Sequence, residues 1–538
     1  MRSLRGNPWA ILLTLSFGFF MTLLDLTIVN IAIPSMIDRL DASLDEVLWV
    51  VNSYVLVLAV LLITAGRLGD LRGQRKAFAA GVAVFTLASL ACGLAGAPGW
   101  LIALRAVQGL GAALLMPQTM AIIIATFPAQ KRGAALGVWG AVAGLATVAG
   151  PTLGGLLVTI ADWRWIFFVN IPIGVAVLVM TFAFIPDTRL QRQHRLDLLG
   201  VALATASLFC LTFALIEGQR FSWNVGIWAL LAASAVFFVI FLVQQRGMQQ
   251  QEPLVPFVLF HDRNFTVLNL AGALVSVGII GFFLPLTIYL QSVLGYSALK
   301  AGLVLAPMSL ISMFIAPAAG HMSDRVGGKY ILMAGLLLFA IGGGWLAFSA
   351  QVDSNWPAFI PETVLMGVGF GGIFAPLATE AMRGVDPRMA GAASGVNNTN
   401  RQLGSVIGSA AVGALLQNRL VASFTDEAHK QAAALPAQFR DRFVDGFESA
   451  AKSGLEVGGQ VSSAAPSGVP HQVAAQLNHL GEVVYRNGFV NGMHPTFVLP
   501  IVAMVAAALS VVLVTRRTSH HAPSGTAARG EARATEPA

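Results

Sequence analysis

Runs of about 20 mostly apolar residues recur along this chain of 538 residues, and they constrain its fold more than any other feature. Lipid leaves helices and closed barrels as the only structures that span a bilayer, and runs of this length predict helices. Only 11% of the residues are charged, whereas soluble globular chains carry roughly 25%. The sequence therefore predicts an all-α integral membrane protein. The net charge of +7 is spread over short loops, so it does not indicate nucleic-acid binding.

We predict 14 transmembrane helices. The expected spans are 9–37, 47–66, 76–97, 99–126, 133–159, 165–186, 197–216, 225–245, 264–292, 299–319, 329–349, 356–381, 391–417 and 491–515. An even number of spans places both termini on one side. The short loops on the other side hold only Arg39, Arg164, Arg220 and Lys300. The positive-inside rule then predicts a multi-pass protein of the cell membrane with both termini in the cytoplasm.

An internal repeat organises these helices. Three short segments recur in order at offsets of 260, 254 and 258 residues: 24–28 with 284–288, 66–73 with 320–327, and 133–138 with 391–396. Parallel repeats of six helices describe the major facilitator fold. The expected parts are a cytoplasmic N-terminus 1–8, a six-helix bundle 9–186, two inserted helices in 187–263, a second bundle 264–515 with an external loop 418–490, and a disordered cytoplasmic tail 516–538.

Five motifs resemble those of a known family, the 14-helix drug:proton antiporters of the QacA/EmrB type. They lie at Leu24–Pro34, Gly66–Lys76, Arg105–Gly111, Gly150–Gly155 and Trp163–Pro172. The resemblance implies a major facilitator that exports drugs or antibiotics in exchange for protons. It also implies that the proton gradient supplies the energy and that no cofactor is needed. We expect drug-like small molecules, protons and the lipid bilayer as partners, and a monomer.

Asp25 and Arg105 are ionisable residues inside the first and fourth expected helices. Such residues are costly in a membrane and mark functional sites. Their depths predict that they meet in the outer half of the N-terminal bundle. The repeat places Pro285 and Thr363 at the equivalent positions, so the pair belongs to one half only. The hypothesis is that Asp25 binds the transported proton and that Arg105 modulates it. The alternative is a static ion pair that joins two helices.

Two further features are candidates for the substrate cavity. Asn397, Asn398 and Arg401 form, with neighbouring serines, a polar stripe along the thirteenth expected helix. The stripe either lines a cavity that handles substrate or supplies hydrogen bonds between helices. Glu362, on the twelfth expected helix, is a weaker candidate and is expected to be a solvated residue near the outer mouth.

The loop after the second expected helix carries Gly66, Asp70, Gly73 and Arg75, and the repeat supplies Asp324. The resemblance implies that these residues form a conformational latch. A carboxylate here can stabilise the N-terminus of a neighbouring helix by roughly 0.3–1 kcal/mol. The alternative is that the basic residues only orient the chain in the membrane.

Gly150 and Pro151 are expected to interrupt the fifth helix, and Gly154 and Gly155 follow one turn later. These four residues belong to a segment that resembles the antiporter motif of the family. Proline removes a backbone hydrogen bond, and small residues let a partner helix approach closely. We interpret the motif as a pliable gate against leak, with ordinary close packing as the alternative.

Phe439, Phe443 and Phe447 recur at helical spacing in the external loop. They predict either an amphipathic helix on the membrane or a small packed core. The chain has no nucleotide-binding loop of the G-x-x-x-x-G-K-[ST] form, so ATP is not the expected energy source. A carrier for a specific metabolite, sugar or lipid remains the alternative function. A polytopic enzyme or sensor is disfavoured because no catalytic constellation is evident.

Overall fold

The computed structural model describes residues 5–187, 197–218, 220–251, 253–453 and 471–515. Within these ranges all regular secondary structure is helical, and 13 helices are long and apolar enough to cross a membrane. The expected span 133–159 lies in α6 (Arg132–Ile160), which contains a shorter apolar stretch, Arg132–Ala146. The structure is therefore consistent with the 14 helices that the sequence predicts.

The α-helices follow one another in three groups along the chain. The first is α1 (Pro8–Ile28), α2 (Ile33–Leu40), α3 (Leu44–Arg72), α4 (Gln74–Gly93), α5 (Pro98–Thr126), α6 (Arg132–Ile160), α7 (Trp165–Phe168) and α8 (Asn170–Phe184). The second is α9 (Leu198–Glu217) and α10 (Val225–Gly247). The third is α11 (Val258–His261), α12 (Arg263–Ile288), α13 (Ala298–Val326), α14 (Lys329–Ser349), α15 (Ile360–Gly371), α16 (Phe374–Met382), α17 (Ala390–Ala432), α18 (Ala437–Ser453), α19 (His471–Thr496) and α20 (Val498–Val512).

Side chains just before several helices satisfy the free backbone N–H groups of the first turn. Asn7 accepts hydrogen bonds at the start of α1, and Asp262 does so at α12. Ser43 and Glu46 form a reciprocal capping box at α3. Because unpaired N–H groups are costly at a membrane surface, these caps fix where the helices begin.

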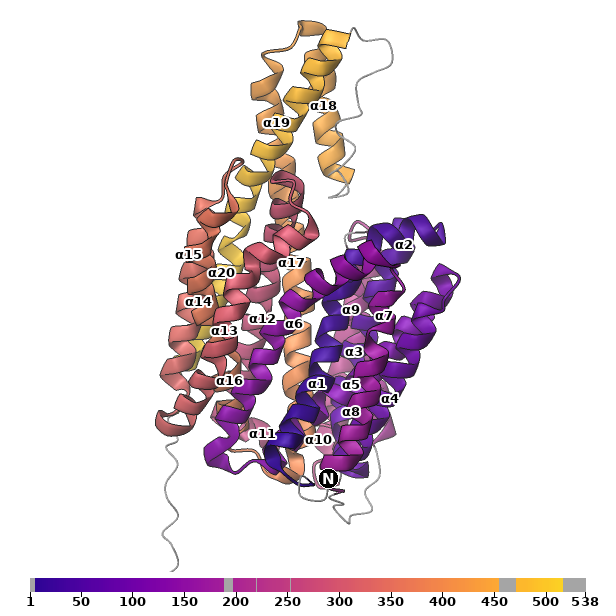
Figure 1. Cartoon of the computed structure of the whole chain (residues 1–538), viewed down its shortest axis with the longest axis vertical. Coiled ribbons are helices and arrows are strands. Elements are labelled where there is room, and N and C mark those ends of the chain that lie inside the picture. The colour runs from indigo at the N-terminus through magenta and orange to yellow at the C-terminus, as the bar shows by residue number, and fades with distance from the viewer. Residues whose placement is uncertain (1–4, 188–196, 219, 252, 454–470, 516–538) are drawn as a thin grey trace, which may run out of the picture.

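Helices α1 to α8 form one bundle and α11 to α20 form a second bundle beside it (Figure 1). One large hydrophobic core lies within the second bundle, and another begins in the first bundle and continues onto α9, α10, α12, α16 and α17. The bundles meet where α13 packs along α6 and α17 packs along α3. Their ribbons lie close together at the end that carries the N-terminus and diverge toward the other end (Figure 1).

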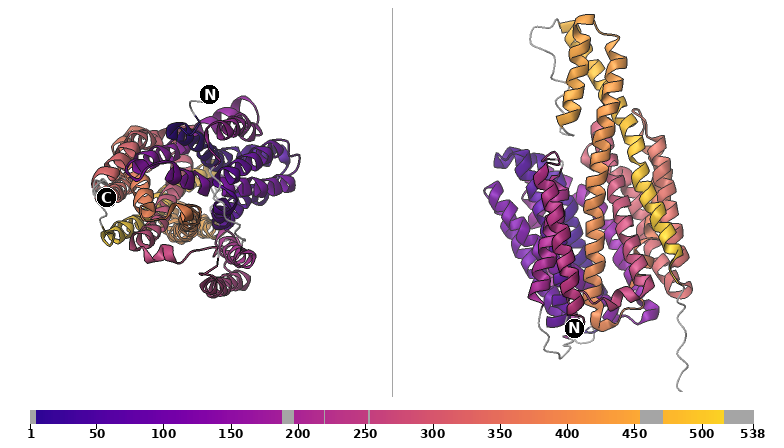
Figure 2. Two further views of the ribbon diagram at one scale, coloured as in Figure 1. Left: turned by 90° about the horizontal axis from the view of Figure 1, so that it is seen from below. Right: turned by 180° about the vertical axis from the view of Figure 1, so that it is seen from behind.

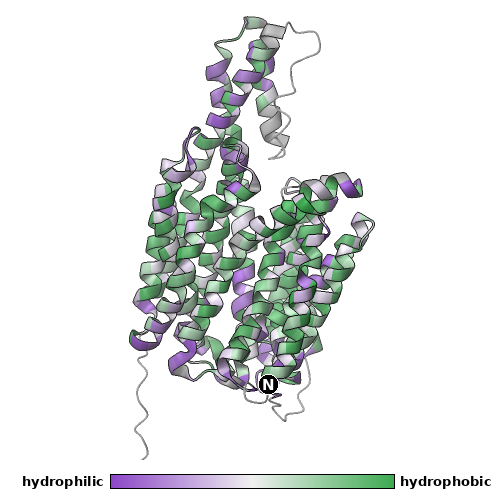
Figure 3. Cartoon of the chain, viewed as in Figure 1, coloured by the Kyte–Doolittle hydropathy of each residue, from purple (hydrophilic) through white to green (hydrophobic). Residues whose placement is uncertain are grey.

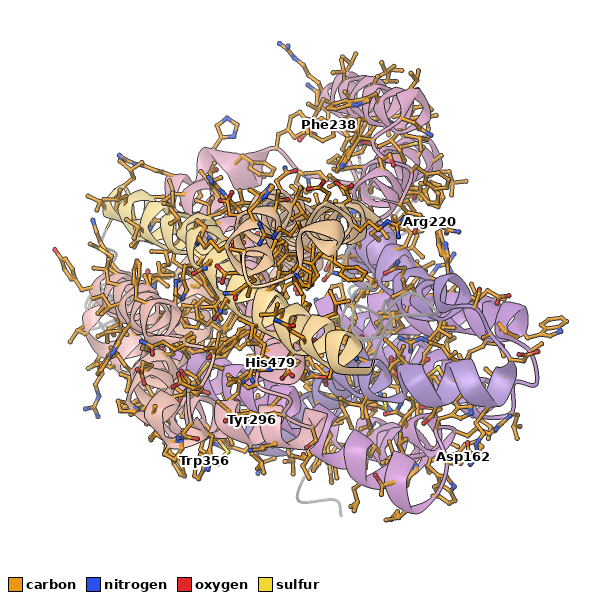
Figure 4. The ribbon with its side chains drawn as sticks, turned by 90° about the horizontal axis from the view of Figure 1, so that it is seen from above. Asp162, Arg220, Phe238, Tyr296, Trp356 and His479 are labelled. Atoms are coloured by element: carbon orange, nitrogen blue, oxygen red, sulfur yellow. The ribbon has the colours of Figure 1, made fainter. Side chains whose placement is uncertain are left out.

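The pair α9 and α10 packs together at the edge of the molecule (Figure 2). Helix α9 contacts both α3 and α17, so the pair lies against the boundary between the bundles. Helix α10 lies further out: Phe238 on it is 51% exposed and points away from the bundles (Figure 4). An apolar side chain with this exposure is suited to contact with lipid.

The region expected as an external loop is largely helical. Helix α17 does not end near 417 but continues to Ala432, and α19 begins at His471 rather than near 491. Its 43 residues make α17 about 65 Å long, roughly twice the hydrocarbon thickness. With α18, these helices project beyond the bundles (Figures 1 and 2), and hydrophilic residues are more frequent in them than in the bundles (Figure 3).

The phenylalanine pattern in this projection forms a small packed core, the second of the two alternatives. The rings of Phe443 and Phe447 lie 5.1 Å apart, and Phe447 packs on Phe424 of α17. Tyr485 of α19 also stacks on Phe424, with the ring centroids 5.7 Å apart. Phe439 is half-buried. The aromatic residues therefore join three helices rather than anchor one helix in a membrane.

Candidate functional site

Asp25 of α1 and Arg105 of α5 meet in the interior of the first bundle. Arg105 donates a hydrogen bond through Nη1 to the Asp25 carboxylate, and the two side chains are 0% and 1% exposed. Arg105 Nε also donates to the backbone oxygen of Val50 on α3, at 3.0 Å. The structure thus brings together the two residues that the sequence singled out, and it anchors the arginine to a third helix.

Two amides complete the ligand shell of the carboxylate. Gln108 donates to Asp25 Oδ1 at 2.9 Å and accepts from Arg105 at 2.8 Å. Asn170, at the start of α8, donates to the same Oδ1 at 3.3 Å. Sequence reasoning assigned neither residue a role. Both were nevertheless visible as polar residues within the quoted motifs, and Gln108 lies one helical turn after Arg105.

The surroundings of the pair exclude water. The Arg105 guanidinium carbon lies 4.3 Å from the ring centroid of Tyr54, which is fully buried. Ser89 receives a hydrogen bond from Asn170 at 3.1 Å and donates to the backbone at Phe167 at 2.9 Å. In such a site, removal of one partner leaves an uncompensated charge that costs about 3–5 kcal/mol. Asp25 and Arg105 therefore depend strongly on each other.

Asp70 and Asp324 make a reciprocal pair of contacts between the bundles. Asp70, at the end of α3, accepts hydrogen bonds from the N–H groups of Gly391 and Ala392 at 2.9 and 2.7 Å, in the first turn of α17. Asp324, at the end of α13, accepts from Gly133 and Ala134 at 2.8 and 3.0 Å, in the first turn of α6. Each carboxylate thus binds the positive N-terminus of a helix in the other bundle.

Glycines make these contacts sterically feasible. A Cβ atom on Gly391 would collide with the Asp70 carboxylate and with the backbone oxygen of Gly66. A Cβ atom on Gly133 would collide in the same way with Asp324 and Gly320. The repeated glycines of the sequence are therefore the points of closest approach between the bundles.

The other two expected latch residues have different roles. Gly73 ends α3 with φ of 99°, a conformation that L-residues with side chains rarely adopt, so it makes the turn into α4. Arg75 donates to the backbone oxygen of Phe182 on α8 at 3.3 Å and lies over the ring of the same residue. Arg75 therefore contacts a helix of its own bundle.

The antiporter motif packs α6 against α1. Helix α6 runs without a break from Arg132 to Ile160, so the expected interruption at Gly150 and Pro151 is wrong. A Cβ atom on Gly150 would collide with Thr27, and one on Gly154 would lie 2.8 Å from Ile28, whereas Gly155 has nothing within 4 Å. The Pro151 side chain lies outside the described part of the chain. The described residues support close packing, and the gate remains a prediction.

The polar stripe on α17 divides into two kinds of residue. Ser394 donates to the backbone of Pro117 on α5 at 2.9 Å, and Asn397 donates to Asn269 on α12 at 3.2 Å. Asn398 is bonded to the backbone of its own helix. These residues supply hydrogen bonds within and between helices. Arg401 differs, because its guanidinium lies 4.7 Å from the ring of Phe374 and its Nε has no hydrogen-bond partner.

Glu362 is not the solvated residue that the sequence predicts. It is 3% exposed, and one carboxylate oxygen accepts a hydrogen bond from Ser349 of α14 at 3.1 Å. Its other oxygen is buried without a partner. The prediction failed because the first turn of α15 is covered by α13 and α14, which the order of residues along one helix does not indicate.

Comparisons with known proteins agree with this architecture. The family model "Major Facilitator Superfamily" matches residues 15–409. The "Tetracenomycin C resistance and export protein" of Streptomyces glaucescens is 34% identical over 98% of this chain and 96% of its own length. "Multidrug export protein EmrB" of Escherichia coli strain K12 is 32% identical over 76% of this chain and 80% of its own.

The fold is also that of solved transporters. The proton:xylose symporter XylE superposes with a TM-score of 0.55 at 14% identity, over 83% of this chain and 94% of that chain. At this identity the likeness concerns the fold alone. The resemblance drawn from the five motifs is confirmed by the family match and by both relatives. This chain belongs to the Major Facilitator Superfamily and has its fold.

Proposed function

We propose that this chain exports amphipathic drugs or antibiotics across the cytoplasmic membrane in exchange for protons, by alternating access. The printed names of two relatives, a resistance and export protein and a multidrug export protein, support the direction and the substrate class. The proposal includes cytoplasmic termini and a monomer that uses the proton gradient without a cofactor. Those parts rest on the distribution of basic residues and on the family resemblance.

One observation carries the coupling: the only described carboxylate deep within the first bundle, Asp25, is completely buried and is bound by one arginine and two amides. A carboxylate in such a site is stable as an anion while Arg105 faces it. If a conformational change withdraws Arg105, the anion is left uncompensated and takes up a proton rather than remain charged. Protonation of Asp25 and movement of Arg105 are therefore coupled events in the proposed cycle.

The reciprocal aspartate contacts supply the two-state element that such a cycle needs. With both contacts made, the bundles are held together at the end that carries the N-terminus, so substrate can exchange only at the opposite end. Opening the N-terminal end requires that Asp70 and Asp324 leave the helix termini. The proposed cycle therefore alternates between this state and one in which both contacts are broken.

The test is substrate-driven proton flux in proteoliposomes. We expect a panel of cationic, neutral and anionic drugs to include compounds that release protons from the wild type, and we expect Asp25→Asn to abolish that release while substrate binding persists. Asp386→Asn is the matched control, since Asp386 is exposed and caps only its own turn. Unchanged proton release from Asp25→Asn contradicts the coupling. Transport restricted to one sugar or lipid would favour the metabolite carrier instead.

A further inference from the structure

Arg401 is a cation within the membrane-spanning helix α17. It lies 11 residues after the start of α17 at Ala390, or about 16 Å along the axis of a helix that rises 1.5 Å per residue. That depth is close to the middle of a hydrocarbon core about 30 Å thick. A lipid phosphate group, which lies at the bilayer surface, is therefore not its natural partner. The side chain is half-buried.

The guanidinium of Arg401 has no ion pair and no hydrogen bond with any residue that the structure describes. Among the described residues, the guanidinium makes a cation–π contact with Phe374. Arg105, the other arginine deep in a bundle, has a carboxylate, an amide and a backbone oxygen. A charge at this depth is expensive unless it is paired, so Arg401 is suited to bind an anion that the chain itself does not provide.

The described acidic residues within the membrane-spanning helices are engaged elsewhere. Asp25 binds Arg105, and Asp70 and Asp324 bind helix termini. Glu380 of α16 pairs with Arg383 at 2.8 Å and accepts a hydrogen bond from the N–H of Gly328 at 2.6 Å. Glu362 binds Ser349 and lies 12 residues before Phe374 on the same spanning segment, or about 18 Å away along the helix. The second bundle thus presents an unpaired positive charge in this conformation.

Arg401 lies over the ring of Phe374 on α16, a helix that packs against α6 of the first bundle. Alternating access places the substrate between the bundles. A Cβ atom on Gly140 of α6, in the first bundle, would lie 3.6 Å from the Cβ atom of Phe374, so Phe374 lies where α16 packs against the first bundle. The aliphatic stem of Arg401 packs near α12 of its own bundle, where a Cβ atom on Gly272 would lie 3.6 Å from Arg401 Cγ. The cation and the ring therefore form one surface that combines a charge with an aromatic face.

We propose that Arg401 and Phe374 bind the acidic end of the substrate, and that aromatic or amphipathic anions are a substrate class of this exporter. The inference rests on the proposed function, which does not specify the charge of the substrate, and adds that this charge is negative. A planar guanidinium matches a carboxylate with two parallel hydrogen bonds, which a single ammonium does not. Phe374 packs on the apolar part next to the acid. A cationic compound of the same shape is repelled by Arg401.

The experiment uses three probes that share one ring system: 1-pyrenebutyrate, 1-pyrenebutyramide and 4-(1-pyrenyl)butyl-trimethylammonium. Binding to the purified full chain is measured by fluorescence, and transport is measured in proteoliposomes with an imposed pH gradient. The variants are Arg401→Gln, Arg401→Lys and, as a control on the same helix, Arg419→Gln, which replaces an exposed arginine. Thermal unfolding of each variant shows whether it is folded.

We expect the wild type to bind the acid at least tenfold more tightly than the cation. Arg401→Gln should lose at least tenfold in affinity for the acid and less than twofold for the amide, with Arg401→Lys between the two and Arg419→Gln unchanged. The inference is overturned if the wild type does not bind the acid, if it binds the cation equally well, or if Arg401→Gln weakens all three probes alike. Selective binding without proton-driven transport would refute the proposed function and leave the anion site intact.

Discussion

Replacing Asp70 with asparagine removes a negative charge from the N-terminus of α17 and leaves the size of the side chain unchanged. Two hydrogen bonds from Gly391 and Ala392 currently end on the carboxylate. An asparagine retains one acceptor oxygen, so one bond is lost and the other no longer ends on a charge. The contact exists only while the bundles are closed at this end. The substitution should therefore destabilise that state relative to the opposite one.

The magnitude follows from two contributions. A charge at a partly buried helix N-terminus is worth up to about 2 kcal/mol, and a hydrogen bond to a charged group exceeds a neutral one by about 1 kcal/mol. A total of about 1–3 kcal/mol shifts the ratio of the two states by roughly 5- to 150-fold. Asp324→Asn should change the free-energy difference between the two states by the same amount. The double variant should change it by about 2–6 kcal/mol, because the two contacts are separate and bias one equilibrium.

The assay is pulsed electron paramagnetic resonance with spin-label pairs at both ends of the molecule. Exposed positions Arg72 and Arg388 report on the end with the aspartate contacts, and exposed positions Asp41 and Asn355 report on the opposite end. We expect Asp70→Asn to lengthen the first distance and shorten the second. The measurement follows populations, so it does not require an identified substrate.

Controls separate the contact from a general charge effect. Cys92 and Cys210 are first replaced by serine, since both are free thiols. Asp386→Asn removes one exposed negative charge at the same end and should leave both distances unchanged. A change of less than twofold in the ratio for Asp70→Asn, or an equal change for Asp386→Asn, would refute the assignment of Asp70 as a latch.

Three further outcomes are expected. Asp25→Asn should lower the free energy of unfolding by about 3–5 kcal/mol, because Arg105 loses its partner. Adding Arg105→Gln should restore most of this stability but not proton release. Thermal unfolding and flux assays measure the two effects. Gly150→Ala should cost about 1–3 kcal/mol and reduce transport because its Cβ meets Thr27, whereas Gly155→Ala, in open space, should be neutral or stabilising in the same assays. Arg75→Gln should leave the spin-label distances unchanged, because Arg75 contacts α8 of its own bundle; a shift like that of Asp70→Asn would contradict this contact.

The residues that were predictable from sequence are those for which the membrane permits few alternatives. Lipid requires apolar helices of a defined length, so the spanning segments follow from hydropathy. An ionisable residue within such a helix is costly unless it is paired, which made Asp25 and Arg105 an expected pair. The repeated segments also marked the aspartates and the glycines that meet across the bundles.

The remaining features depend on which helix covers which face. Glu362 is buried because α13 and α14 pack over it, and Asn397 is bonded to Asn269 on a helix far away in sequence. Neither fact follows from position along one helix. The continuation of α17 to Ala432 was missed because hydropathy identifies only the segment within the membrane. Beyond the membrane, α17 remains helical because other helices pack on it.

The symmetric and the asymmetric features of the chain serve different parts of the proposed cycle. The aspartate contacts occur once in each half, so both halves take part in the same conformational change. The Asp25 site and Arg401 each occur in one half only. If one proton enters as one monoanion leaves, two positive charges in effect move inward per cycle. At about 2.3 kcal/mol per charge per 100 mV, the membrane potential alone then contributes about 4.6 kcal/mol at 100 mV, twice its contribution to the export of a neutral compound. The unpaired charge of Arg401 thus bears on both the selectivity and the driving force of export.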